Sequence, residues 1–77
     1  MKPREAQVIG RAAGREIARR VLAGEPPPAF RDGLAKLLRE AGLEAGSYLG
    51  DVAVFAALWA YTDAIEEAKG KLFGEGP

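Results

Sequence analysis

The sequence contains no cysteine and no histidine. Without cysteine, the chain has no disulfide bond, no thiolate metal ligand and no cysteine nucleophile. Without histidine, it lacks the commonest general base and the commonest metal ligand of proteins. These two absences exclude several classes of function, whereas no residue that is present points to a particular function.

Amides and hydroxyls are also scarce. The 77 residues include no asparagine and only one glutamine, one serine and one threonine, and arginine outnumbers lysine seven to four. Depletion of thermolabile amides and of cysteine is reported for thermophile proteins, and Arg, Ala, Gly and Pro have GC-rich codons. The composition therefore favours a thermophilic source, with a GC-rich mesophile as the alternative.

Large hydrophobic side chains are few for a chain that must fold by itself. Hydrophobic residues make up 48% of the sequence, which excludes an ordinary disordered chain, but 15 of these 37 residues are alanine. A chain of this size buries only ~60–65% of its unfolded surface, so a monomer has a marginal core. We therefore expect a homo-oligomer, a dimer or higher, and also allow for a different protein partner.

No long apolar run is present. The N-terminal residues MKPREAQVIGR contain no apolar stretch of the ~7–15 residues typical of a signal peptide. The most apolar stretch, Val52–Tyr61, has ten residues and lies between Asp51 and Asp63, whereas a membrane span needs about 20. We expect no contact with a membrane and a cytoplasmic location.

The spacing of apolar residues and the positions of glycine and proline predict an all-α fold of three helices, two long and one short, in a single domain covering residues 1–77. Pro3 suits the first turn of a helix, and Gly24 suits a C-terminal cap before the three consecutive prolines that follow Glu25. Ser47 is a suitable N-cap for the last helix. The expected helices cover about 3–23, 28–41 and 47–71, with a flexible tail at 72–77.

The middle helix has the most regular pattern. Its apolar positions follow the i, i+4, i+7, i+8, i+11 spacing of one buried stripe: Phe30, Leu34, Leu37, Leu38 and Ala41. Gly42 and Leu43 come directly afterwards. A glycine followed by a hydrophobic residue predicts a Schellman ending, in which the hydrophobic side chain folds back on the last turn.

Small residues recur every four positions along one edge of the first helix, at Ala6, Gly10, Gly14 and Ala18. Glycine inside a helix costs ~1 kcal/mol relative to alanine, so two glycines one turn apart need a structural reason. Close approach of another helix backbone is the usual reason. We predict such a contact, the alternative being a helix that is merely weak.

The third helix is apolar on two sides. Alanines spaced 4, 3 and 4 residues apart share one face, as in a heptad seam, and large residues such as Phe55 and Trp59 lie on the other. A helix that is apolar on both sides is buried on both sides. We therefore predict an oligomer or partner interface on this helix, while the sequence leaves open which face is core and which is interface. The predicted interface residues are Ala53, Ala57, Ala60, Ala64, Phe55 and Trp59.

Charge is divided between the two halves of a neutral chain. Residues 1–39 carry a net charge of +5 and residues 40–77 carry −5. Four arginines, at positions 4, 11, 15 and 19, fall on one side of the first helix, opposite its apolar face. Three interpretations stay open for this arginine stripe (Arg4, Arg11, Arg15 and Arg19): contact with phosphates or an acidic partner, pairing with the acidic half of the same or a neighbouring chain, or a solvated face.

No group of residues points to catalysis. Asp63 and Glu67 lie one turn apart, but without histidine they form no di-iron type motif, and Ser47 and Tyr61 have no base within reach. The glycine pairs lie inside predicted helices and no strand precedes them, so the sequence has no glycine-rich phosphate loop. We predict a helical interaction module that is not an enzyme and binds no cofactor or metal. The alternative is a nucleic-acid-associated protein that uses the arginine stripe.

Overall fold

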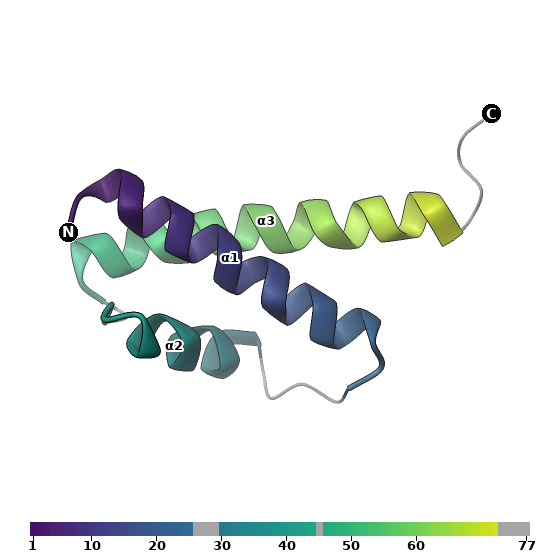
Figure 1. Cartoon of the computed structure of the whole chain (residues 1–77), viewed down its shortest axis with the longest axis horizontal. Helices are drawn as coiled ribbons and strands as arrows, with labels where there is room; N and C mark the ends of the chain where they lie inside the picture. Colours follow the sequence, from purple (N-terminus) through teal and green to yellow (C-terminus); the bar gives the residue numbers. More distant parts are fainter. Residues whose placement is uncertain (26–29, 45, 73–77) are drawn as a thin grey trace.

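The computed structural model describes residues 1–25, 30–44 and 46–72, which form three α-helices (Figure 1). α1 spans Pro3–Leu22, α2 spans Phe30–Glu40 and α3 spans Tyr48–Leu72. No strand occurs in this part of the chain, so the predicted all-α, three-helix fold is confirmed. The predicted start of the middle helix at residue 28, the three prolines and residues 73–77 of the predicted tail lie outside the described residues.

The helices are arranged as a thin layer. α1 and α3 run in the same direction and cross at about the middle of α1 and in the N-terminal half of α3 (Figure 1). α2 runs back alongside this region (Figure 1). Towards their C-terminal ends α1 and α3 diverge, so the last turns of α3 project beyond the other two helices (Figure 1). The Cα atoms extend over only 14 Å in the shortest direction, against 43 Å in the longest.

The two glycines of α1 bring its backbone into contact with the backbone of α3. A Cβ atom added at Gly10 would lie 2.8 Å from the Cα atom of Ala53 and would overlap its carbonyl oxygen. One turn later, a Cβ atom at Gly14 would lie 2.9 Å from the Cα atom of Ala57. Real Cβ atoms do not approach backbone so closely, so only glycine fits at both positions. The predicted close approach is therefore confirmed.

The core consists mainly of small side chains. Ten hydrophobic residues are buried, and six of them are alanine. Leu38 is the only large side chain that is fully enclosed among the described residues. Ile17 of α1, Leu34 of α2 and Leu43 complete the larger part of the core. Close contact between helix backbones, more than bulky side chains, therefore holds α1 against α3.

The end of α2 has the predicted Schellman geometry. The N–H of Leu43 donates to the carbonyl oxygen of Leu38 (2.8 Å), and the N–H of Gly42 donates to that of Arg39 (3.0 Å). Gly42 has a φ of +89°, which is the left-handed conformation that this ending requires. Leu43 is buried in the same core cluster as Leu38, so the residue that ends the motif also contributes to the hydrophobic core.

The start of α3 is fixed by Ser47, as predicted. Its Oγ atom accepts a hydrogen bond from the N–H of Gly50 (3.0 Å) and donates one to the carbonyl oxygen of Glu44 (2.7 Å). A side-chain oxygen that accepts from the third helical N–H is the standard N-cap interaction. The cap therefore fixes the residue at which α3 begins.

Candidate interaction surface

The structure assigns different roles to the two apolar faces of α3. Ala53 and Ala57 are completely buried against α1, and Ala60 is 8% exposed. On the opposite face Phe55 is 66% exposed and Trp59 is 72% exposed.

The predicted interface set therefore splits into two groups. Ala53, Ala57 and Ala60 belong to the core within one chain, because the glycines of α1 accept only small side chains there, and they are not available to a partner. Ala64 is half-buried beside them. Phe55 and Trp59 remain the accessible members of the set.

Three exposed aromatic residues and one half-buried valine share one side of α3, which we call the aromatic stripe: Tyr48, Val52, Phe55 and Trp59. Their spacing of 4, 3 and 4 residues is that of a heptad seam, so they lie on one side of the helix. Tyr48 is 72% exposed and Val52 is half-buried. Tyr48 is not among the interface residues predicted from the sequence, although it lies two helical turns before Phe55 at the same heptad spacing.

A shallow apolar depression lies within the same face of α3. It has a volume of about 300 Å³ and is lined by Phe55, Leu58, Trp59 and Thr62. These residues occupy positions i, i+3, i+4 and i+7, which are the four positions that surround one inserted side chain in knobs-into-holes packing between helices. The depression is open to solvent, and its lining belongs to α3 alone.

A second groove, of about 540 Å³, runs between α1 and α3 beside Trp59. Arg11 and Arg15 of α1 form one wall, and Asp63 and Glu67 of α3 form the other. Among the described residues, neither arginine makes an ion pair with Asp63. Because both signs of charge face the groove, its electrostatic character is mixed.

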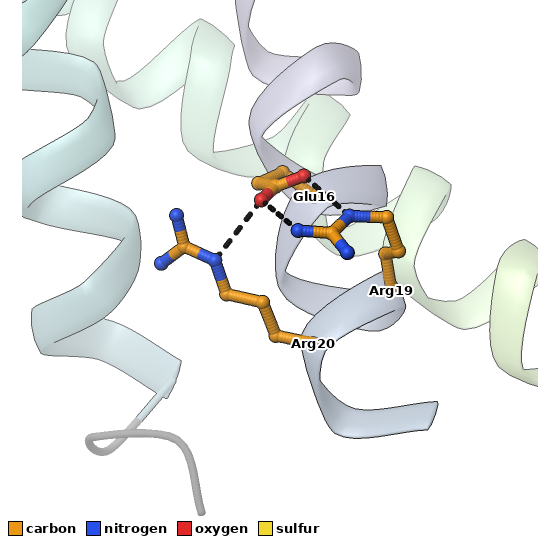
Figure 2. Close-up of polar contacts among 3 residues, drawn as sticks. All are labelled: Glu16, Arg19 and Arg20. Carbon is orange, nitrogen blue, oxygen red and sulfur yellow. Dashed lines mark hydrogen bonds and ion pairs between the residues drawn. The ribbon is translucent and has the colours of Figure 1, made fainter. Parts of the chain in front are cut away.

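The arginine stripe is exposed along α1, as its position opposite the apolar face predicts. Arg19 makes two hydrogen bonds with Glu16, Nε to Oε1 at 2.9 Å and Nη2 to Oε2 at 2.8 Å, and Arg20 donates from Nε to Oε2 at 3.0 Å (Figure 2). The bond from Arg19, followed by that from Arg20, lowers the pKa of Glu16 from 4.5 to about 2. One member of the stripe thus has a local partner within the helix.

The side chains considered for chemistry have structural contacts. The Ser47 hydroxyl is engaged in the cap of α3, and the Tyr61 ring packs edge-on against Phe30 with centroids 4.9 Å apart. Asp63 is exposed on α3. Within the described residues no three acidic side chains are grouped closely enough to hold a metal ion.

Comparisons of the chain with models of protein families, with curated proteins and with solved structures gave no match. No helix among the described residues has both the length and the hydrophobicity that a membrane span requires.

Proposed function

We propose that this protein is a small, non-enzymatic interaction module that forms a homodimer through the aromatic stripe of α3. One observation carries the proposal: α3 is apolar on two opposite sides, and only the alanine side is covered within the chain. Three large aromatic residues of the uncovered side are more than 60% exposed. A water-exposed apolar row of this kind marks an interaction surface.

The thin core of the single chain supports association. Burial of a large hydrophobic side chain contributes about 1.5–3 kcal/mol, yet only four of the ten buried hydrophobic residues are larger than alanine. Tyr48, Phe55 and Trp59 are each of the size that dominates interface energetics. Covering them would add a contribution comparable to that of the largest residues in the existing core.

A second copy of the chain is the occupant that we favour. The chain is neutral overall, so two copies do not repel each other through their net charge. The heptad-like spacing of the stripe is also suited to packing against an identical helix.

Light scattering over a dilution series tests this function. We expect a species of twice 8.2 kDa at high concentration that dissociates on dilution. Phe55→Gln should raise the dissociation constant by about tenfold or more, because it removes a central aromatic contact. Val8→Gln is the matched control, since Val8 is similarly exposed but lies on α1, and it should leave the constant unchanged.

A single 8.2 kDa species at every concentration from low micromolar to near millimolar would contradict the proposal. Equal effects of Phe55→Gln and Val8→Gln would also contradict it, because they would show that the stripe is not the contact. Circular dichroism of each variant verifies that the helices remain folded.

Binding of nucleic acid is a second candidate function, and one contact favours it. Trp59 lies beside Arg11 and Arg15 in the groove between α1 and α3. An aromatic platform next to basic side chains is the arrangement that binds single strands, through stacked bases and phosphates. Asp63 and Glu67 on the opposite wall weigh against it, because carboxylates repel phosphates. Self-association therefore ranks first.

A further inference from the structure

We infer that the two copies pair with their α3 helices antiparallel, each inserting Tyr48 into the depression between Phe55, Leu58, Trp59 and Thr62 of the other. This inference rests on the proposed dimer and specifies its geometry. Tyr48 is 72% exposed on α3, and the depression lies on the same side of the helix.

The aromatic stripe has an internal symmetry that suits reversal of the helix. The point midway between residues 53 and 54 is the centre of two pairs of residues. Tyr48 and Trp59 lie at equal distances on either side of it, and Val52 and Phe55 form a second, closer pair. A two-fold axis at this point places Tyr48 of each copy opposite Trp59 of the other, and Val52 opposite Phe55. Every member of the stripe then meets a hydrophobic partner, which a symmetric dimer contact requires.

The depression and the side chain that fills it are related by the same axis. The four residues that line the depression are centred between residues 58 and 59. The two-fold axis places this point of one α3 opposite the point between residues 48 and 49 of the other. Tyr48 lies at this point and is 72% exposed. One chain thus carries both the protruding side chain and the depression that receives it.

A parallel pair also places hydrophobic residues opposite one another, because each member of the stripe then faces its own counterpart, but it brings two carboxylates together. Continued at the same spacing, the stripe next reaches Thr62 and then Glu66, which is exposed. In a parallel pair Glu66 would meet Glu66 of the second copy on the seam, and like charges at contact distance repel. In the antiparallel pair Glu66 projects beyond the N-terminal end of the opposing α3, so this repulsion is avoided.

Spin-label distances between the two copies distinguish the orientations, and the absence of cysteine allows single labels without background. The labelled variants are Asp51→Cys and Glu66→Cys, at two exposed positions of α3. With a rise of 1.5 Å per residue, the antiparallel pair separates the two Glu66 positions by about 37 Å along the helix axis. The corresponding separation for Asp51 is only about 8 Å.

We expect the Glu66→Cys distance to exceed the Asp51→Cys distance by roughly 20 Å or more once the lateral spacing of the helices is included. Equal distances at the two positions would overturn the antiparallel arrangement while leaving the dimer itself intact. The absence of any distance between copies, together with a monomeric mass by light scattering, would overturn the proposed dimer as well.

A pair of substitutions tests the insertion of Tyr48. Tyr48→Ala should raise the dissociation constant by about tenfold, because the depression loses the side chain that fills it. Glu44→Ala is the control, at an exposed residue just before α3 that lies off the stripe. An unchanged constant for Tyr48→Ala, with a dimer still present, would overturn the insertion.

Discussion

At the scale of single residues, Gly10 and Gly14 decide how close α1 can come to α3. Each glycine costs about 1 kcal/mol of helix propensity relative to alanine. The absent side chains let the two helices meet at Ala53 and Ala57 with backbone in contact. Dispersion contacts between closely packed atoms are individually weak but numerous, and they offset the loss of propensity.

Substitution of Gly10 by alanine should therefore destabilise the fold, although alanine is the better helix former. The added Cβ atom would overlap the backbone of Ala53, which has no freedom to move aside as a flexible side chain would. We expect a loss of about 1–3 kcal/mol in the free energy of unfolding, measured in urea. Ala12→Gly, on the exposed side of α1, is the control and measures the effect of helix propensity alone. A higher urea midpoint of unfolding for Gly10→Ala than for the wild type would contradict the close contact.

Glu16 gives the fold a defined dependence on pH. Its hydrogen bonds with Arg19 and Arg20 lower the pKa of the folded state from 4.5 to about 2, so the folded chain holds the ionised form more strongly than the unfolded chain does. The stabilisation is complete above pH 4.5 and is lost as the pH falls towards 2.

The difference in urea midpoint between the wild type and Glu16→Gln should therefore shrink over this range. Glu40→Gln is the control, because Glu40 is exposed and makes no ion pair among the described residues. A difference that stays constant from pH 7 to pH 2 would show that the ion pairs do not form in solution.

At the scale of elements, α3 carries two different apolar surfaces. Its alanine face fits the glycines of α1, and its aromatic stripe is left open. Because residues advance by 100° along a helix, both surfaces are maintained over several turns without interfering with each other. The helix therefore acts as the central element of the chain and, under the proposed function, of the dimer.

Ala57→Leu should separate α1 from α3 and lower the free energy of unfolding by about 1–3 kcal/mol through overpacking. Ala57 is completely buried opposite Gly14, so a larger side chain has no space. Ala12→Leu, at an exposed position of α1, should have little effect. Thermal denaturation followed by circular dichroism measures both, and an unchanged melting temperature for Ala57→Leu would place the alanine face in water.

At the scale of the whole molecule, the chain is a layer that is only 14 Å thick between its Cα atoms. A layer of this thickness encloses few side chains, which accounts for a core with one fully enclosed large residue among the described positions. Small chains commonly gain the missing stability through association. The exposed stripe on the longest helix is where the layer would gain most by being covered.

The arginine stripe allows the two candidate functions to be separated. The double variant Arg11→Glu and Arg15→Glu should leave the unfolding midpoint nearly unchanged, because exposed charges contribute ~0–1 kcal/mol each. A gel shift with single-stranded and duplex DNA at low salt should show no binding by either protein. Salt-dependent binding that the double variant abolishes would instead promote nucleic-acid binding, with a slope of log K against log salt of about −3 to −4 for duplex and four contacts.

The sequence by itself determined the three helices, the C-terminal end of α2, the N-cap of α3 and the presence of a close helix contact on α1, but not which helix makes that contact. These features depend on signals that act within a few residues: the left-handed glycine at position 42, the hydroxyl of Ser47, and the glycines one turn apart in α1. Local backbone preferences and hydrogen bonds are largely independent of the rest of the chain. They could therefore be inferred without knowing how the helices pack.

Only the tertiary structure decided which face of α3 is core and which is open. The periodicity of α3 makes both faces apolar, so hydrophobicity alone favours neither. The choice depends on the surface that α1 presents, and its glycines leave room for the alanines but not for Phe55 or Trp59. Shape complementarity between distant segments, which no local pattern encodes, thus selected the candidate surface.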